Sequence, residues 1–569
     1  MKHIFGYIGK YKGRMAGGIT LKTAGALAEL VLPLILAYMI DTVAPTRSAP
    51  MLVLWGVAML FVSAAAYLCN VLANRMASRV GRDVTESLRG DLFTKTLSLS
   101  FRQADAVTLP SLVSRLSSDT YNVHTMLVMT QRMGIRAPLM LIGGVALTFT
   151  LDPILALVLL AVVPVLTVFV VFISSRGVKL YTSLQRAVDG MVRKVRDDHA
   201  GIRVIKALSK TEYESRTFRS LNEGVSLAER RAGVTMGITN PVLNFFLNLG
   251  MTAVIFVGAY RVAGGHAGVG DLIAFTSYFA IILNAVIAVS RIFVMLTRGT
   301  ASARRIEEVL CLPEDLLPLP GKEEADDALI RFDEVSFSYD GAPVLEDLSF
   351  SVRKGETLGI IGGTGSGKST LISLLLRFYD ADSGSISVAG KDVRSYLPHE
   401  LRKKFGVVFQ SDFLMSASIR ENIDFERNVP LENIPKAAEC ARAADFISAL
   451  EEGYETRLAV RGANFSGGQK QRLLIARALA GDPEILVLDD SSSALDYKTD
   501  AQLRRSLAEE YPDATVLMVA QRISSVRGAD KILVLDGGRA VGFGTDKELM
   551  QTCEVYRRIY DSQRGTENA

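Results

Sequence analysis

Residues 357–376 read TLGIIGGTGSGKSTLISLLL, and this stretch decides the fold of the C-terminal part of the chain. A β-rich apolar run leads into a glycine loop, and a helical run follows, which is the strand, loop and helix order of a phosphate-binding P-loop. Glycines let backbone N–H groups close around phosphates, and the helix adds its positive end. The predicted nucleotide-binding residues are Gly362, Gly363, Thr364, Gly365, Ser366, Gly367, Lys368, Ser369 and Thr370.

A site for phosphate and Mg²⁺ is predicted from two P-loop residues, Lys368 and Ser369, and from the end of one distant strand. Lys368 can reach the terminal phosphates of a nucleotide, and the Ser369 hydroxyl can ligate Mg²⁺. Residues 485–490 read ILVLDD, a hydrophobic strand that ends in two acids. An acid that closes a buried strand is costly without a cation, so we expect Asp489 to complete the Mg²⁺ site.

The N-terminal part of the chain has a different composition. The 569 residues are 49% hydrophobic with a mean hydropathy of +0.25, yet 22% of them are charged, so two regimes share the chain. Six apolar segments are long enough to span a membrane. They lie near 16–40, 51–73, 130–151, 153–175, 236–260 and 272–296.

The links between these segments predict their orientation. The links at 74–129 and 176–235 are long and rich in Lys and Arg, which favours the cytoplasmic side for both. An even number of crossings then leaves the N- and C-termini in the cytoplasm. We expect the helices to continue beyond the bilayer as intracellular extensions that reverse near 103–112 and 205–220.

The predicted fold class is an α-helical membrane domain of six long transmembrane helices followed by a mixed α/β P-loop nucleotide-binding domain. The expected boundaries are 1–310 for the membrane domain, 311–327 for a linker and 328–569 for the nucleotide-binding domain. A formal charge of +4 is too small to indicate nucleic acid as a partner, and six apolar runs argue against a soluble P-loop ATPase. The four cysteines have neither metal-ligand nor disulfide spacing.

The stretch FSGGQKQRLLIARAL at 465–479, followed by ILVLDD, extends the pattern beyond a P-loop. With these motifs the whole chain resembles an ATP-binding cassette (ABC) transporter of the exporter-type half-transporter arrangement. The resemblance implies that two chains are required, with each ATP held between one chain's P-loop and the other chain's signature. The signature here is Ser466, Gly467, Gly468 and Gln469.

Further roles follow from the same resemblance. It implies that Tyr339 stacks on adenine and that Gln410, in the Q-loop, contacts both ATP and Mg²⁺. Asp489 ends the Walker B strand, and residues 493–496 form the D-loop, whose Asp496 contacts the ATP of the partner's site together with the signature. A multi-pass protein of the bacterial inner (plasma) membrane is expected, with the lipid bilayer as its surroundings.

Two positions depart from the family pattern at the catalytic centre. The acid after the Walker B aspartate is normally glutamate, which polarises the attacking water, but here it is Asp490. The switch histidine that contacts the γ-phosphate is replaced by Gln521, within VLMVAQRIS at 516–524. Val460 replaces a glutamate of the segment before the signature. The prediction is therefore an ATP site that binds nucleotide but hydrolyses it poorly.

An intact signature beside a weakened Walker site favours a heterodimer with a second half-transporter, similar to the asymmetric bacterial multidrug exporters. This chain's signature then completes a competent site on the partner, and the pair exports amphipathic small molecules or drugs by alternating access. Three alternatives stay open: a siderophore or metal-chelate importer with the same fold, a lipid flippase, and a slow homodimer.

Polar residues within the predicted spans are the candidates for the substrate cavity. Glu29 lies in the first span, Asn244 and Asn248 share a face of the fifth, and Asn284 lies in the sixth. Each of these either lines a cavity, where Glu29 attracts cations, or positions the helices through hydrogen bonds. We expect Arg132, Arg136 and Arg291 to lie near interfaces or helix extensions rather than in a site.

Overall fold

The computed structural model describes residues 2–314, 316–320, 327–339, 341–491 and 495–567. The chain divides into two compact units. The first contains Met1–Leu97 and Val107–Leu312, and the second contains Ser98–Ala106 and Pro313–Ala569.

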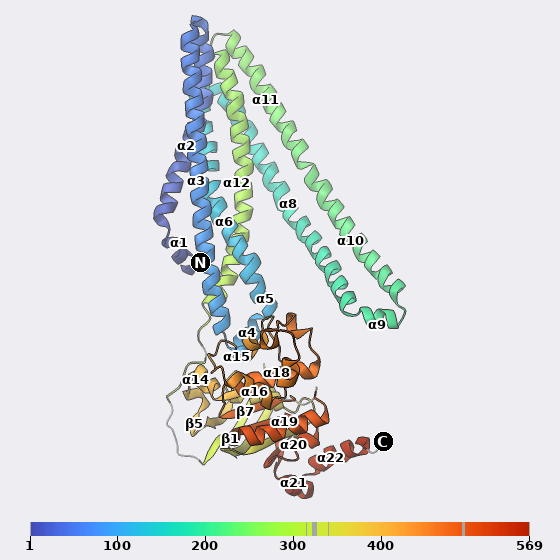
Figure 1. The fold of residues 1–569 in the computed structure, drawn as a ribbon. Helices are drawn as coiled ribbons and strands as arrows, with labels where there is room; N and C mark the ends of the chain where they lie inside the picture. Colours follow the sequence, from blue (N-terminus) through green and yellow to red (C-terminus); the bar gives the residue numbers. More distant parts are fainter. Residues whose placement is uncertain (1, 315, 321–326, 340, 492–494, 568–569) are drawn as a thin grey trace. The chain divides into compact units, whose positions relative to one another are not determined.

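The first unit is entirely helical within the described residues. Its long helices run along one another, as Figure 1 shows for α2, α3 and α12. Its elements are α1 (Lys2–Gly9), α2 (Lys12–Tyr38), η1 (Met39–Val43), η2 (Ala44–Thr46), α3 (Ala49–Ser98), α5 (Leu109–Ser114), η3 (Arg115–Asp119), α6 (Thr120–Arg132), α7 (Arg136–Leu151), α8 (Pro153–Ala200), α9 (Ile202–Ala207), α10 (Thr211–Gly237), α11 (Thr239–Ala263) and α12 (Val269–Leu310).

The predicted helical membrane domain is confirmed. Among the described residues, five helical stretches are long and apolar enough to cross a membrane, and α8 opens with a shorter apolar stretch, Pro153–Phe169. The five are Lys12–Thr46, Ala49–Ser98, Leu109–Leu151, Asn244–Ala263 and Val269–Leu310. α3 has 50 residues and α8 has 48. At about 1.5 Å per residue each is more than twice the ~30 Å of a hydrocarbon core, so both continue well beyond a bilayer.

Two acids, the buried Asp152 and the half-buried Asp41, stabilise the short turns at one end of this unit. Asp152 caps α8 by accepting hydrogen bonds from the backbone N–H groups of Ile154 (2.8 Å) and Leu155 (3.2 Å), and its other oxygen pairs with Arg261 of α11 at 2.9 Å. Asp41 accepts the N–H groups of Gly270 (2.7 Å) and Asp271 at the start of α12. These contacts tie α7 and α8 to α11, and α2 to α12.

The helices α8, α9, α10 and α11 form a long hairpin. α8 and α10 lie side by side with α9 at the turn, and the pair diverges from α2, α3 and α12 (Figure 1). The turn exposes apolar side chains, with Val204 60% exposed and Leu208 63% exposed. Within the described residues of this chain, little covers that end of the hairpin.

The second unit is a mixed α/β domain. One sheet has the strand order β2-β1-β4-β5, and the other has the order β10-β9-β3-β8-β7-β6. The strands are β1 (Ala328–Tyr339), β2 (Ala342–Arg353), β3 (Thr357–Gly362), β4 (Ser383–Val388), β5 (Lys391–Asp392), β6 (Phe405–Val408), β7 (Ile485–Asp489), β8 (Thr515–Ala520), β9 (Lys531–Asp536) and β10 (Arg539–Gly544).

Helices accompany both sheets. They are α4 (Phe101–Val107), α13 (Lys368–Leu375), α14 (Pro398–Lys403), α15 (Ile419–Asp424), α16 (Asn433–Cys440), α17 (Ala444–Ser448), α18 (Gly467–Ala480), α19 (Tyr497–Glu510), α20 (Ile523–Val526), α21 (Asp546–Thr552) and α22 (Glu554–Glu567), with short turns η4 (Val393–Ser395), η5 (Gly453–Glu455) and η6 (Val460–Gly462). The apolar side chains of β3, β7 and β8 lie at the centre of the core. The predicted α/β domain is therefore confirmed.

The larger sheet positions the predicted nucleotide residues. β3 pairs in parallel with β8, and β8 pairs in parallel with β7, so these strands end at one edge of the sheet. Ligands of open α/β sheets bind outside this carboxyl edge. A side chain at Gly362, the last residue of β3, would come within 2.2 Å of the Leu535 carbonyl, so the turn into the P-loop requires glycine there.

The segment Ser98–Ala106 belongs to the second unit, although it lies in the sequence between two membrane-type helices. The Phe101 ring stacks on Phe378 at 4.4 Å between centroids, and the Tyr379 hydroxyl donates to the Asp105 carboxylate at 2.7 Å. Gln103 also donates its side-chain amide to the Pro313 carbonyl at 2.8 Å. The sequence predicted a helix reversal near 103–112, but it did not predict these contacts.

Candidate functional site

A pocket of about 200 Å³ forms at the carboxyl edge of the larger sheet. It brings the P-loop together with residues from three further loops, which follow β6, β7 and β8. The residues predicted from the sequence that line this pocket are Thr364, Gly365, Ser366, Gly367, Lys368, Ser369, Thr370, Gln410, Asp489, Asp490 and Gln521. Gly362 and Gly363 lead into this loop from β3 and accept hydrogen bonds from Lys368.

The Lys368 ammonium group points back into its own loop. It donates to the carbonyls of Gly362 (2.9 Å) and Gly363 (2.7 Å). Burial lowers the pKa of Lys368, and the nearby carboxylates of Asp489 and Asp490 partly oppose that shift. Because α13 begins at Lys368, the N–H groups of its first turn lack partners within the helix and are available to phosphate oxygens.

Asp489 is a buried acid with a hydroxyl beside it. It is 5% exposed, and its carboxylate accepts a hydrogen bond from Ser369 at 3.0 Å. Burial raises the pKa of Asp489 and the negative charge of Asp490 adds to the rise, while the Ser369 hydrogen bond opposes it. A buried carboxylate next to a hydroxyl oxygen is a donor set that fits Mg²⁺, which takes oxygen ligands and keeps several waters.

The two residues that depart from the family pattern lie in the same pocket. Asp490 has a left-handed backbone (φ 51°), and its N–H donates to the Val519 carbonyl of β8 at 2.9 Å. The Gln410 amide donates to the Asp490 carboxylate at 3.4 Å. The side chain of Gln521 is exposed. The backbone carbonyl of Gln521 accepts a hydrogen bond from the side-chain amide of Gln563 at 2.8 Å.

Tyr339 ends β1 and remains partly exposed, at 36%. Its ring meets Phe337 and Tyr379 edge-on, with centroids 4.8 and 5.2 Å away. These two neighbours hold the ring in place at the surface of the smaller sheet. An exposed, laterally supported tyrosine is suited to stacking on a base.

The signature residues form a surface separate from this pocket. Ser466 caps α18: its hydroxyl accepts from the Gln469 N–H at 3.3 Å, and its own N–H donates to the Gln469 side chain at 2.9 Å. Ser466 and Gly467 are exposed, and Gly468 is half-buried, so the positive end of the helix faces outward. Val460, before the signature, is 73% exposed.

Asp496 is an exposed helix cap as well. It begins α19 by accepting hydrogen bonds from the N–H (2.9 Å) and hydroxyl (2.7 Å) of Thr499, and these bonds lower the pKa of Asp496. Ser493 and Ala494, predicted to belong to the same loop, lie outside the described residues.

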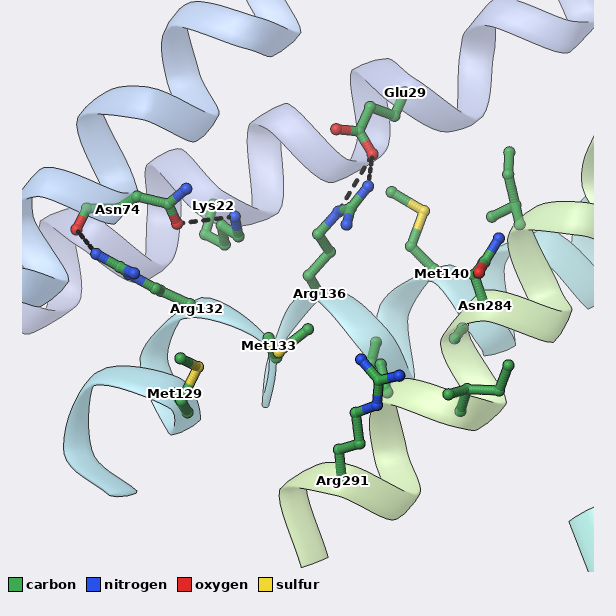
Figure 2. Close-up of a pocket in the computed structure, with 15 residues that line it drawn as sticks. Lys22, Glu29, Asn74, Met129, Arg132, Met133, Arg136, Met140, Asn284 and Arg291 are labelled. Carbon is green, nitrogen blue, oxygen red and sulfur yellow. Dashed lines mark hydrogen bonds and ion pairs between the residues drawn. The ribbon is translucent and has the colours of Figure 1, made fainter. Parts of the chain in front are cut away.

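A second cavity, of about 680 Å³, lies within the helical unit between α2, α3, α6, α7 and α12 (Figure 2). Glu29 and Asn284 both line it. Asn284 also donates its amide to the Ala280 carbonyl one turn earlier, at 2.9 Å. Asn244 and Asn248 of α11 are exposed and are not among the residues that line this cavity.

Basic side chains also line this cavity. Arg132, Arg136 and Arg291 were expected near interfaces or helix extensions rather than in a site. All three line the cavity, together with Lys22 of α2. The seven-residue spacing of Asn284 and Arg291 places both on one face of α12. Arg132 ends α6 and Arg136 begins α7, and the turn between the two helices brings both side chains to the cavity. The spacing on α12 was the signal available in the sequence, whereas the α6–α7 turn could not be read from it.

Comparisons with known proteins agree with both units. Residues 15–286 match the family model of the ABC transporter transmembrane region, and residues 345–493 match the ABC transporter model. An uncharacterized ABC transporter ATP-binding protein from Mycobacterium tuberculosis is 35% identical over 566 residues, covering 98% of this chain and 97% of that relative. The uncharacterized ABC transporter ATP-binding protein YfiB of Bacillus subtilis is 34% identical over 544 residues, covering 95% of each chain.

A solved structure gives the same result for the fold. The structure of a bacterial Atm1-family ABC exporter with ATP bound superposes with a TM-score of 0.81 at 25% identity, and covers 97% of this chain and 98% of that one. The P-loop, the signature and the apolar helices therefore belong to one known architecture. The chain is a member of the ABC transporter family, with an exporter-type membrane domain and an ATP-binding domain.

Proposed function

We propose that this chain is one subunit of a heterodimeric ABC exporter whose own ATP site is degenerate. The pair exports amphipathic small molecules or drugs across the cell membrane by alternating access. In this assembly, ATP turnover takes place mainly at the partner's Walker site, which this chain's signature completes. Both termini and the nucleotide-binding domain lie in the cytoplasm.

The observation that carries the proposal is the joint replacement at Asp490 and Gln521. Both residues line the pocket that contains Lys368 and Asp489, so the two changes affect one catalytic centre. An aspartate arm is shorter than a glutamate arm by one carbon–carbon bond, about 1.5 Å, and errors of about 1 Å in position can cost about a hundredfold in rate. Hydrolysis at this site is therefore slow.

Gln521 adds a second loss. Its amide can donate a hydrogen bond to the γ-phosphate, but it cannot carry a positive charge or move a proton as an imidazole does. The binding elements are intact: Lys368 and the P-loop N–H groups hold the phosphates, and Tyr339 supports the base. Mg²⁺, held by Ser369, Asp489 and Gln410, would neutralise phosphate charge. The site consequently binds ATP but cleaves it poorly.

The signature supports the role of this chain at the partner's site. In the capping box the side chain of each of Ser466 and Gln469 accepts the backbone N–H of the other, which fixes the start of α18. A helix N-terminus that begins with the exposed Gly467 favours a phosphate group from another chain. A homodimer would combine this intact surface only with weakened Walker sites.

The hairpin formed by α8–α11 is further support for the proposal that a second chain is present. It diverges from the other helices of its unit, and its turn exposes Val204, Leu208 and Tyr213. Apolar side chains at the tip of a water-exposed extension favour burial against a partner. The partner's nucleotide-binding domain is the proposed surface.

The decisive experiment expresses this chain alone and together with a half-transporter that has glutamate and histidine at the two positions. We expect Mg²⁺-dependent ATP turnover and dye efflux from the pair, and ATP binding with little turnover from the chain alone. Photolabelling with an azido-ATP separates binding from cleavage. Rapid turnover by the purified chain paired only with itself would contradict the degenerate-site proposal.

A further inference from the structure

The cavity of the helical unit has an unbalanced charge. Its lining includes four basic side chains, from Lys22, Arg132, Arg136 and Arg291, and one acidic side chain, Glu29. Four positive charges and one negative charge leave a formal surplus of three positive charges. Figure 2 shows these side chains around the same space, from α2, the α6–α7 turn and α12.

Both carboxylate oxygens of Glu29 accept hydrogen bonds from neighbouring side chains. Its Oε2 pairs with the Arg136 guanidinium at 2.6 Å, with a second bond from Nε at 3.2 Å, and its Oε1 accepts the Asn70 amide at 2.8 Å. Glu29 therefore neutralises Arg136 rather than offering a site for a cation. The interaction also fixes one face of the cavity by joining α2, α3 and α7.

Among the described residues, the other three cations form no hydrogen bond or ion pair with an acidic side chain. Lys22 donates to the neutral side chains of Asn70 (2.8 Å) and Asn74 (3.1 Å). Arg132 donates to the Asn74 carbonyl and the Ser78 hydroxyl, and its Nε is buried without a hydrogen bond. Arg291 is exposed toward the cavity and forms no ion pair with any described residue.

The cavity lies far along the spanning helices from the turn between α7 and α8. Arg136 is 16 residues before Asp152, which caps the turn between α7 and α8. At 1.5 Å per residue this places Arg136 about 24 Å from that turn, so the cations lie toward the far edge of a hydrocarbon core of about 30 Å. Lys22 is 5% exposed and the Arg132 Nε is buried without a hydrogen bond, so positive charge here is costly without an anion, and an anion in the cavity would relieve that cost.

We propose that this cavity selects amphipathic anions, with the acidic head among Lys22, Arg132 and Arg291. This inference rests on the proposed export function and specifies its substrate class. Arginine favours carboxylate, sulfonate and phosphate groups because its planar fork can donate two parallel hydrogen bonds. The adaptable side chains of Met129, Met133 and Met140 line the same space and contact the apolar body of the substrate. The volume suits a drug-sized molecule or part of a lipid.

The test uses two probes that differ only in charge: 11-(dansylamino)undecanoic acid and its carboxamide. Binding to the co-expressed pair in phosphatidylcholine nanodiscs, without nucleotide, is followed by dansyl fluorescence. We expect the acid to bind about tenfold more tightly than the carboxamide. Arg132→Gln and Arg291→Gln should each reduce that ratio to about two. Arg298→Gln, an exposed arginine on the same helix outside the cavity, should leave the ratio unchanged.

Equal binding of the two probes by the unmodified pair, or tighter binding of the carboxamide, would overturn the inference without any variant being needed. Binding is measured without ATP, so this result is independent of ATP-driven efflux, whose absence would instead contradict the proposed function. Nanodiscs containing phosphatidylglycerol distinguish two sources of the anion. Competition by this lipid identifies a lipid headgroup as the anion, and unchanged acid binding identifies a free amphipathic acid.

Discussion

The side-chain amide of Gln410 donates a hydrogen bond to the carboxylate of Asp490 over 3.4 Å. Gln410 follows β6 and Asp490 follows β7, and the two strands pair in parallel, so their carboxyl ends bring the side chains together. Hydrogen bonds to charged groups are usually about 2.7–2.9 Å long, so this contact is weak. A glutamate at position 490 would extend its oxygens about 1.5 Å further from the strand.

Restoring the two substituted residues should restore catalysis. We expect Asp490→Glu combined with Gln521→His to raise ATP turnover at this chain's site by about tenfold or more, because the carboxylate regains its reach and the imidazole its proton transfer. The measurement is phosphate release by the pair, with the partner's own Walker glutamate changed to glutamine so that only this site can turn over.

The matched control for this restoration is Asp536→Glu. Asp536 also ends a strand of the same sheet, but it is exposed and lies outside the phosphate pocket. It should leave phosphate release unchanged. If the double variant is no faster than the unmodified chain, the shortened acid is not what limits the site.

The signature should matter more for turnover than the P-loop of the same chain. Ser466→Ala removes a capping hydroxyl at the proposed phosphate-facing helix end, and we expect turnover by the pair to fall about tenfold, the worth of one hydrogen bond to a charged group. Lys368→Ala should abolish azido-ATP labelling of this chain with a smaller loss of turnover. Steady-state phosphate release compares the two variants.

Ser418→Ala is the control for helix capping. Ser418 caps α15 through the same capping-box geometry, with Glu421 in place of Gln469, but it is not in the signature. Both serine variants lose a cap worth about 1 kcal/mol, so a fall in turnover common to both would indicate lost stability rather than lost catalysis.

The local motifs of the nucleotide site were predictable because each lies within a short stretch of sequence. The P-loop consists of consecutive residues, and hydrophobic runs such as ILVLDD predict individual strands, but not their order in the sheet. The contact of Ser369 with Asp489 was expected from a shared Mg²⁺ site, and the place of Gln410 from the family resemblance. The lengths of the contacts, and the backbone strain at Asp490, could not be read from sequence.

The lining of the cavity in the helical unit could be predicted only in part from the sequence. Apolar segments predict where helices lie along the chain, but not how each helix rotates about its axis. Glu29 and Asn284 were candidates because they interrupt apolar runs, whereas Arg132 and Arg136 resembled residues at a membrane boundary. Only the packing of α2 against α7 brings Arg136 to Glu29 and reveals the surplus of positive charge.

Burial of Asp489 predicts a pH-dependent effect on stability. Because its pKa is raised in the folded protein, Asp489 binds its proton more tightly when folded than when unfolded. Its charged form therefore destabilises the nucleotide-free fold increasingly as pH rises from the unfolded pKa of about 3.9 through the raised folded pKa. Asp489→Asn should raise the Tm at pH 7 by about 2–4 °C, and the difference should vanish near pH 4.

Differential scanning fluorimetry across pH, in detergent and without nucleotide, measures this effect. Asp513→Asn, at an exposed position, should leave Tm unchanged at every pH. Addition of Mg²⁺ and ATP should stabilise the unmodified chain more than Asp489→Asn, since the amide is a poorer ligand. A lower Tm for the nucleotide-free Asn variant at pH 7 would show that the charged carboxylate stabilises the fold.

The hydrogen bond between Tyr379 and Asp105 should couple ATP turnover to transport. Tyr379 also packs edge-on against Tyr339, so one side chain contacts both the base-stacking tyrosine and α4. Tyr379→Phe keeps the ring and its packing but removes the hydroxyl, and we expect dye efflux per ATP to fall while ATP labelling is unchanged.

A double-mutant cycle of Tyr379→Phe with Asp105→Asn isolates this contact from other effects of each change. If the hydrogen bond carries the coupling, the double variant should lose no more efflux per ATP than either single variant, because the second change removes a partner that is already gone. Tyr511→Phe, a tyrosine of the same domain, should leave the ratio unchanged. Strictly additive losses in the cycle would mean that the two residues act on transport independently.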